Sequence, residues 1–139
     1  MEIIANALQT VDTQSNVLFT DTVISGKCSS AHRAGSGLVT LRGITNQCRA
    51  RYKVSFGANI GLPTGGTVGP ISIAIAIEGE AIASTTMIYT PAAVEEFGNV
   101  FSAIFVDVPR GCCVTISVKN TSDQEIDVQN ANLIVERVA

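Results

Sequence analysis

The sequence predicts an all-β fold, an antiparallel sandwich or barrel, from the spacing of its apolar residues. Apolar side chains recur at every second position in 50–58, 71–77 and 114–118. Successive side chains of a strand point to opposite faces, so this period predicts strands that are buried on one face. No segment of comparable length has helical spacing. About eight such strands at near-regular intervals are typical of a sandwich or barrel.

The expected elements follow in chain order. Residues 1–26 are rich in Asn, Gln, Thr and Asp, and we expect an N-terminal arm with one strand around Asn16–Thr20. Residues 27–139 are expected to form the single sandwich domain. The tight reversal at Glu78-Gly79-Glu80 predicts a hairpin of 71–77 with 81–89. The remaining strands are expected at 38–42, 50–58, 99–108, 112–120 and 126–138.

The segment 99–108 is apolar on both faces. Val100, Ile104, Val106 and Val108 share one face, whereas Phe101, Ala103 and Phe105 share the other. A strand that is apolar on both sides is expected to be central and buried twice. In a trimeric sandwich such a strand would lie on the subunit interface.

Composition favours a protein that assembles with copies of itself. Hydrophobic residues make up 46% of the 139 residues and charged residues only 15%, against about 25% in typical soluble domains. The missing charge favours a homo-oligomer that covers part of the surface, and a compact β-domain is the alternative. No apolar run approaches the roughly 18 residues that span a membrane. Residues 1–8 lack the features of a signal peptide, so we expect synthesis and folding in a cytoplasm.

Charge is unevenly distributed along the chain. Six bases and no acids lie between Lys27 and Lys53, whereas acids dominate after Lys53. The acidic balance argues against general nucleic-acid binding. The basic stretch is interpreted first as a solvated strand face, and docking on an acidic partner is the alternative.

The four cysteines do not have the spacing of a zinc site. Cys112 is expected in the core, on the same side as Val114, and Cys113 on the opposite side. Free thiols are the expected state in a cytoplasm, and a late Cys28–Cys48 disulfide is the alternative.

The sequence predicts a protein without catalytic, cofactor-binding or metal-binding residues. The single histidine, His32, is expected in a surface loop, without an orienting acid or an oxyanion-hole motif. The pairs Glu78/Glu80 and Glu95/Glu96 fall in turns and connections, where solvated charge is the norm, and the chain has no Trp to line a sugar cleft. No nucleotide or cofactor motif is present.

Three segments resemble tumour-necrosis-factor-like jelly rolls, a fold shared with the complement globular head. Gly69–Glu80 is similar to the middle hairpin of that fold, Phe105–Ile116 to its late hairpin and Asn130–Val138 to its closing strand. The resemblance covers roughly residues 37–138. It implies an antiparallel two-sheet jelly roll that assembles as a trimer.

The whole chain also resembles a group of short proteins encoded in bacteriophages and prophages of gut Firmicutes. The resemblance lies in Thr40–Arg51, Pro63–Ile71 and Val128–Leu133. It implies a non-enzymatic virion protein, a capsid decoration or head-fibre component that is displayed as a homotrimer on the particle. Under this hypothesis Phe101, Ala103 and Phe105 are candidate interface residues.

The implied partners are further copies of the chain and the major capsid protein or another virion protein, contacted through the N-terminal arm or the basic 27–53 stretch. Neither nucleic acid nor a membrane is expected as a partner. The alternative function is a receptor- or glycan-binding tip of a phage tail or fibre, with a host-surface glycan as ligand. A small hydrolase is the least favoured hypothesis, because the sequence lacks a nucleophile–base pair.

Overall fold

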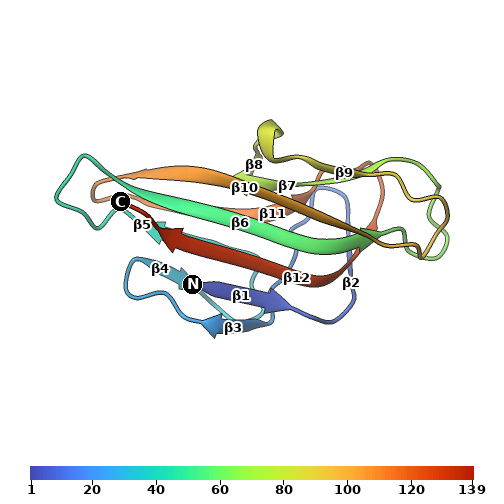
Figure 1. Cartoon of the computed structure of the whole chain (residues 1–139), viewed down its shortest axis with the longest axis horizontal. Coiled ribbons are helices and arrows are strands. Elements are labelled where there is room, and N and C mark those ends of the chain that lie inside the picture. The colour runs from blue at the N-terminus through green and yellow to red at the C-terminus, as the bar shows by residue number, and fades with distance from the viewer.

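A computed structural model describes all residues from Met1 to Ala139. The chain forms two antiparallel sheets that pack face to face, with β6, β10 and β12 drawn in front of β5, β7 and β11 (Figure 1). None of its segments is a helix long and apolar enough to cross a membrane. The expected two-sheet antiparallel sandwich is therefore confirmed.

The first sheet, here sheet A, has the strand order β10-β6-β12-β1-β3, and β2 also pairs with β12. Its strands are β1 (Glu2–Ala5), β2 (Gln9–Val11), β3 (Asp21–Ile24), β6 (Arg49–Gly61), β10 (Gly98–Pro109) and β12 (Ile126–Arg137).

The second sheet, sheet B, has the order β4-β5-β11-β7-β8, and β9 also pairs with β7. Its strands are β4 (Ser30–His32), β5 (Val39–Arg42), β7 (Ile71–Ile77), β8 (Glu80–Ala81), β9 (Met87–Tyr89) and β11 (Cys113–Asn120). A short 3-10 turn, η1 (Ala83–Thr85), interrupts the expected 81–89 strand.

The core lies between the two sheets and is built by alternation along the long strands. Tyr52, Val54 and Phe56 of β6 are buried, while Arg51 and Lys53 between them are exposed. Burial of apolar area is the main stabilising term, at roughly 25 cal/mol per Å². The inward and outward faces that the sequence predicts for this strand are confirmed.

The β7–β8 reversal has the expected form. Ile77 pairs with Glu80, which leaves a two-residue loop of Glu78 and Gly79. Both loop residues have positive φ, 54° and 81°, as a type I′ turn requires. Gly79 adopts this conformation without steric cost, because it has no Cβ.

The first 26 residues belong to sheet A, and residues 14–17 also form backbone hydrogen bonds with β11 of sheet B. They contain β1, β2 and β3 instead of one strand, and they contribute Ile3, Val17 and Phe19 to the core. The strand expected around Asn16–Thr20 is wrong, since only an isolated bridge from Asn16 to Lys119 forms there. Residues 1–26 are rich in polar side chains, so the alternation of apolar residues was too weak to locate the strands in this segment.

The expected central position of 99–108 is also wrong. Strand β10 is the edge strand of sheet A and pairs only with β6. Val106 and Val108 point into the core, whereas Phe101, Ala103 and Phe105 are exposed on the outer face. Apolar residues on both faces of one strand therefore reflect one buried and one uncovered surface.

Candidate functional site

The outer face of sheet A carries an exposed apolar surface, which we call the aromatic patch. Phe101 and Phe105 on β10 are 65% and 62% exposed. The register places Phe101 beside Gly57, and places Ala103 beside Ser55 and then Ile134 across the next strand. The patch consists of Phe101, Ala103, Phe105, Ser55, Gly57 and Ile134.

Small residues in the middle of the patch let another chain approach the sheet closely. A Cβ built on Gly57 would lie 3.6 Å from the Phe101 ring, so that ring partly covers the glycine. Large apolar surfaces that remain exposed on one chain commonly mark interaction sites. The patch is therefore a candidate contact surface.

Polar groups border the patch along β6, β10 and β12. An amide ladder runs from the Asn99 side chain to that of Asn59, and from Asn59 to that of Asn130. Asn132 donates a hydrogen bond to the Glu2 carboxylate at 2.6 Å. A patch of apolar residues with a polar rim has the composition of a protein–protein interface.

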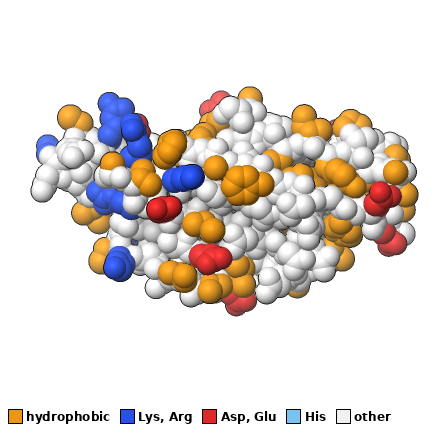
Figure 2. Space-filling model, viewed as in Figure 1, with side chains coloured by type: hydrophobic (Ala, Val, Ile, Leu, Met, Phe, Trp, Pro, Cys, Tyr) orange, Lys and Arg blue, Asp and Glu red, His pale blue; other side chains and the backbone are white.

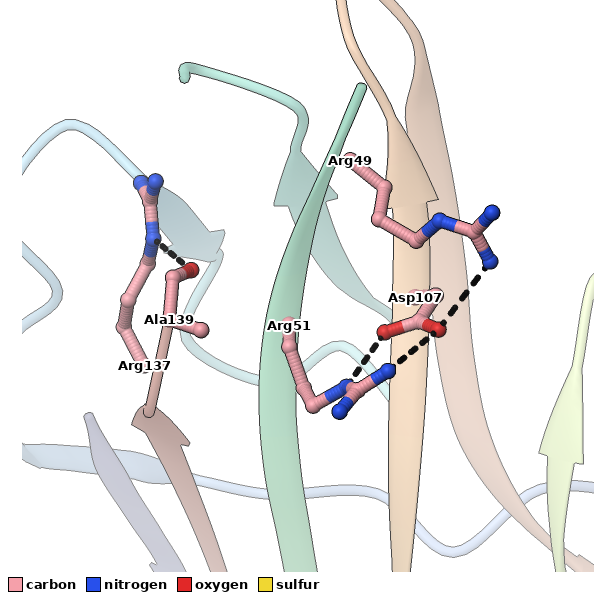
Figure 3. A network of polar contacts seen from close by, with 5 residues as sticks. All are labelled: Arg49, Arg51, Asp107, Arg137 and Ala139. Carbon is pink, nitrogen blue, oxygen red and sulfur yellow. Dashed lines mark hydrogen bonds and ion pairs between the residues drawn. The ribbon is translucent and has the colours of Figure 1, made fainter. Parts of the chain in front are cut away.

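The opposite border holds a charged cluster (Figure 3). Arg51 donates two hydrogen bonds to the Asp107 carboxylate, from Nε at 2.8 Å and from Nη2 at 3.1 Å. Arg49 approaches the same carboxylate at 3.5 Å. Hydrogen bonding to Arg51 holds the pKa of Asp107 below its usual value, and the same bond raises the pKa of Arg51.

We expect Asp107→Asn to lower the thermal midpoint slightly at neutral pH. Because the pKa of Asp107 is lowered in the folded state, its contribution is present above the unfolded value of about 3.9 and is lost as the pH falls through the folded value. The difference in thermal midpoint between Asp107→Asn and the wild type should therefore shrink and then disappear as the pH falls through the lowered pKa of Asp107. Asp123→Asn, at an exposed position, is the control, and a difference that persists at low pH would contradict the assignment.

Most of the basic side chains gather at the end of the sandwich where the C-terminus lies, here called the basic end (Figures 1 and 2). Arg49 pairs with Pro109 and Arg42 pairs with Cys113, so the bases of β5 and β6 lie at the same end as Arg110, which follows β10. The basic end contains Lys27, Arg42, Arg49, Arg51, Lys53, Arg110 and Arg137, together with the acids Glu2, Asp107 and Glu136.

Tyr52 fixes the backbone beneath these bases. Its ring is buried, and its hydroxyl lies 2.6 Å from the Arg42 carbonyl oxygen and 3.0 Å from that of Ser29. The Arg137 guanidinium lies 5.8 Å from the centre of the same ring, within the range of a cation–π contact. Beside Tyr52 is a cleft of about 400 Å³ that Ile24, Lys27 and Glu136 help to line.

Gly43 allows the loop after β5 to approach the β10–β11 turn. A Cβ at this position would lie 2.0 Å from the Pro109 carbonyl oxygen. The approach is held by hydrogen bonds from Gly43 N to Cys112 O and from Gly111 N to Gly43 O, at 2.8 and 3.0 Å. Glycine thus keeps Arg42 and Arg110 on neighbouring segments.

All four cysteines lie at the basic end as free, exposed thiols. Cys112 lies in the turn before β11 and is exposed, so the expected core position is wrong. Because Cys112 precedes the strand, it does not share the inward face of Val114, which packs against the core. The alternative Cys28–Cys48 disulfide is not formed. No three His, Cys, Asp or Glu side chains lie close enough together to hold a metal ion.

His32 is the last residue of β4 and is half-buried instead of lying in an open loop. Its Nδ1 lies 2.8 Å from the Thr22 hydroxyl, and its Nε2 lies 2.9 Å from the Ser36 carbonyl oxygen. Both ring nitrogens therefore serve to tie β3 to the β4–β5 connection. Glu78 lies in the β7–β8 turn and accepts a hydrogen bond from Thr115 N, whereas Glu80 begins β8. Glu95 and Glu96 lie in the connection before β10, where Glu95 accepts a hydrogen bond from the Thr64 hydroxyl.

No protein-family model matches the sequence, and neither does any curated protein. The structure is similar to the globular domain of zebrafish complement 1qA protein, with a TM-score of 0.64, 10% identity and coverage of 96% of this chain and 93% of that one. The likeness is one of fold. Murine APRIL at pH 5.0 has a TM-score of 0.64 and 11% identity, with 97% of each chain covered. The Eiger tumour necrosis factor of S. frugiperda has a TM-score of 0.64 and 12% identity, with 100% and 92% covered.

These likenesses confirm the tumour-necrosis-factor-like jelly roll that the sequence predicts. Sequence reasoning found Phe101, Ala103 and Phe105, but it missed Ile134, Arg110 and Arg137. Ile134 joins the patch through the pairing of β12 with β6, and Arg110 and Arg137 reach the basic end only in the folded chain. The alternation of 131–137 places Ile134 on the polar face of β12, and an apolar residue on that face was the signal that could have identified it as part of the patch.

Proposed function

We propose that the protein is a non-enzymatic structural component of a bacteriophage virion, a homotrimer that decorates the capsid or forms part of a head fibre. The main evidence for the trimer is that Phe101 and Phe105, both on the edge strand β10, are each more than 60% exposed. Isolated apolar residues on a surface are ordinary, but two large rings beside Gly57 and Ile134 form a continuous apolar surface.

A second copy is the occupant that best fits the patch. The low charge content of the chain already favours self-association, and the amide ladder and the Arg–Asp cluster supply a polar rim on both sides. In a threefold ring the contact is heterologous, so the patch of one copy meets a different surface of the next. A stable contact buries about 800 Å² per partner.

Mass measurement of the purified protein tests the trimer. The proposal expects a species of three times the 14.5 kDa protomer mass in multi-angle light scattering at micromolar concentration. A protein that remains a monomer when concentrated would defeat this part of the proposal.

The virion role rests on the resemblance of Thr40–Arg51, Pro63–Ile71 and Val128–Leu133 to phage proteins. The protein would be made in the host bacterial cytoplasm and bound to the major capsid protein or another virion protein. Immunogold electron microscopy of purified particles tests this role. The proposal expects label on the particle surface, and particles without label would reject it.

A receptor- or glycan-binding tip is the second candidate function. The observation that favours it is the cleft beside Tyr52, whose 400 Å³ lies within the usual range for small-ligand pockets, about 300–1,000 Å³. The Tyr52 ring is buried, however, and cannot offer an open face to a sugar. A glycan array without any bound sugar would remove this candidate.

A further inference from the structure

We propose that the basic end is an attachment pole, which binds a carboxylate-rich protein surface while the opposite end faces away from it. The inference deepens the proposed function, because it names the attachment surface and the chemistry of its partner. It goes beyond the basic 27–53 stretch, since Arg110 and Arg137 join this end only in the folded chain.

The two ends of the sandwich carry opposite charge (Figure 2). The basic end has seven bases against three acids, whereas the other end has six acids, with Lys119 at its border. Loops around 62–70, 90–97 and 121–125 meet there, as shown by the Glu95 N to Leu62 O and Thr67 N to Gln124 Oε1 hydrogen bonds. This acidic end contains Asp12, Glu95, Glu96, Asp123, Glu125 and Asp127.

The distance between the ends keeps their charges independent. Arg51 and Gly61 lie on the same strand, and Gly61 pairs with Asp127. Ten residues of extended strand span about 33 Å, whereas charges in water are screened over about 8 Å at physiological salt. The acidic end therefore does not neutralise the basic end, even though the whole chain has a net charge of −3.

Five of the seven bases have no carboxylate side chain as a partner, although Arg42 donates a hydrogen bond to the Cys28 carbonyl oxygen and Arg137 to an oxygen of Ala139. The ion pairs within the chain join only Arg49 and Arg51 to Asp107. Lys27, Arg42 and Arg110 are exposed and have no carboxylate partner. Hydrogen bonds of Tyr52 and Gly43 hold the backbone of the segments that carry Arg42 and Arg110.

A carboxylate surface fits this end better than a nucleic acid does. Single-stranded nucleic acid is usually bound by exposed aromatic rings as well as bases, but the Tyr52 ring at this end is buried. Duplex binding relies on many phosphate contacts from a strongly basic face, whereas this end has an excess of only four positive charges. The Arg51–Asp107 pair already has the two-bond geometry of guanidinium with carboxylate.

Binding of the full chain to immobilised poly-L-glutamate tests the pole. We expect binding at low salt that weakens about tenfold or more between roughly 50 and 500 mM NaCl. Lys27→Glu/Arg110→Glu should reduce affinity about tenfold. The matched control is Arg33→Glu/Lys119→Glu, which changes net charge equally, because Arg33 and Lys119 are the two bases outside the basic end.

The outcomes separate this inference from the proposed trimer. Equal loss in both double variants would show dependence on net charge alone and would overturn the pole, as would tighter binding of duplex DNA than of poly-L-glutamate. If the protein is a trimer but does not bind poly-L-glutamate, the attachment pole is rejected and the proposed trimer stands. If it is a monomer that binds poly-L-glutamate, the trimer is rejected and the attachment pole stands. If the double variant fails to fold, Arg110→Glu against Arg33→Glu gives the same comparison.

Discussion

Phe101→Glu should convert the trimer into folded monomers. The side chain is 65% exposed in the single chain, so the change leaves the core intact. In a trimer the same position would be covered, and an unpaired carboxylate buried there costs about 3 kcal/mol or more at each contact. That cost weakens each contact by roughly a hundredfold. Light scattering should report the protomer mass at concentrations where the wild type is trimeric.

Ile88→Glu is the matched control for this change. Ile88 is 68% exposed and is not part of the aromatic patch, although its strand β9 in sheet B lies next to the start of β10. It should keep the wild-type mass. An intact trimer of Phe101→Glu would exclude Phe101 from the interface, and monomers from both variants would mean that any added charge disrupts assembly.

Gly43→Ala should destabilise the fold by about 3–5 kcal/mol. The added Cβ would meet the Pro109 carbonyl oxygen at 2.0 Å and the carbonyl carbon at 2.9 Å, and these are backbone atoms. The β10–β11 turn would have to move, and the two hydrogen bonds between Gly43 and this turn would weaken. Because domains are stable by only about 5–15 kcal/mol, urea unfolding should show a large fall in the midpoint.

Gly69→Ala supplies the comparison. No atom lies within 4 Å of a Cβ built on Gly69, and its φ is not in the left-handed region. Its free energy of unfolding should therefore stay within about 0.5 kcal/mol of the wild type. Both variants should be measured at one protein concentration, since assembly shifts apparent stability. Equal midpoints for the two variants would contradict the close approach at Gly43.

The sequence predicted the strands that alternate cleanly. The segments 50–58, 71–77, 112–120 and 126–138 correspond to β6, β7, β11 and β12, with ends that differ by a few residues. Each has one apolar and one polar or small face, which is the pattern that a half-buried strand requires. Phe101, Ala103 and Phe105 were singled out because they break this pattern.

The misses share a physical cause. Strands β1 to β4 are three or four residues long, too short to display a period. The edge position of β10 depends on which strand lies next to β6, and local spacing does not contain that information. The basic 27–53 stretch was recognised in the sequence, but Arg110 and Arg137 were not joined to it, because they lie far from it in sequence and reach it only in the folded chain.

The pairing of β1 with β12 sets the order in which the molecule can be completed. Ile3 is fully buried and pairs with Leu133, so Ile3 cannot reach its native environment until Leu133 has been synthesised. Translation at about 5–20 residues per second leaves that strand waiting on the order of ten seconds on the ribosome. Such distant pairings also favour slow folding, in milliseconds to seconds. The apolar side chain of Ile3 on β1 therefore stays exposed on the nascent chain until β12 has been made. A chaperone that binds β1 during this time would raise the yield of folded protein.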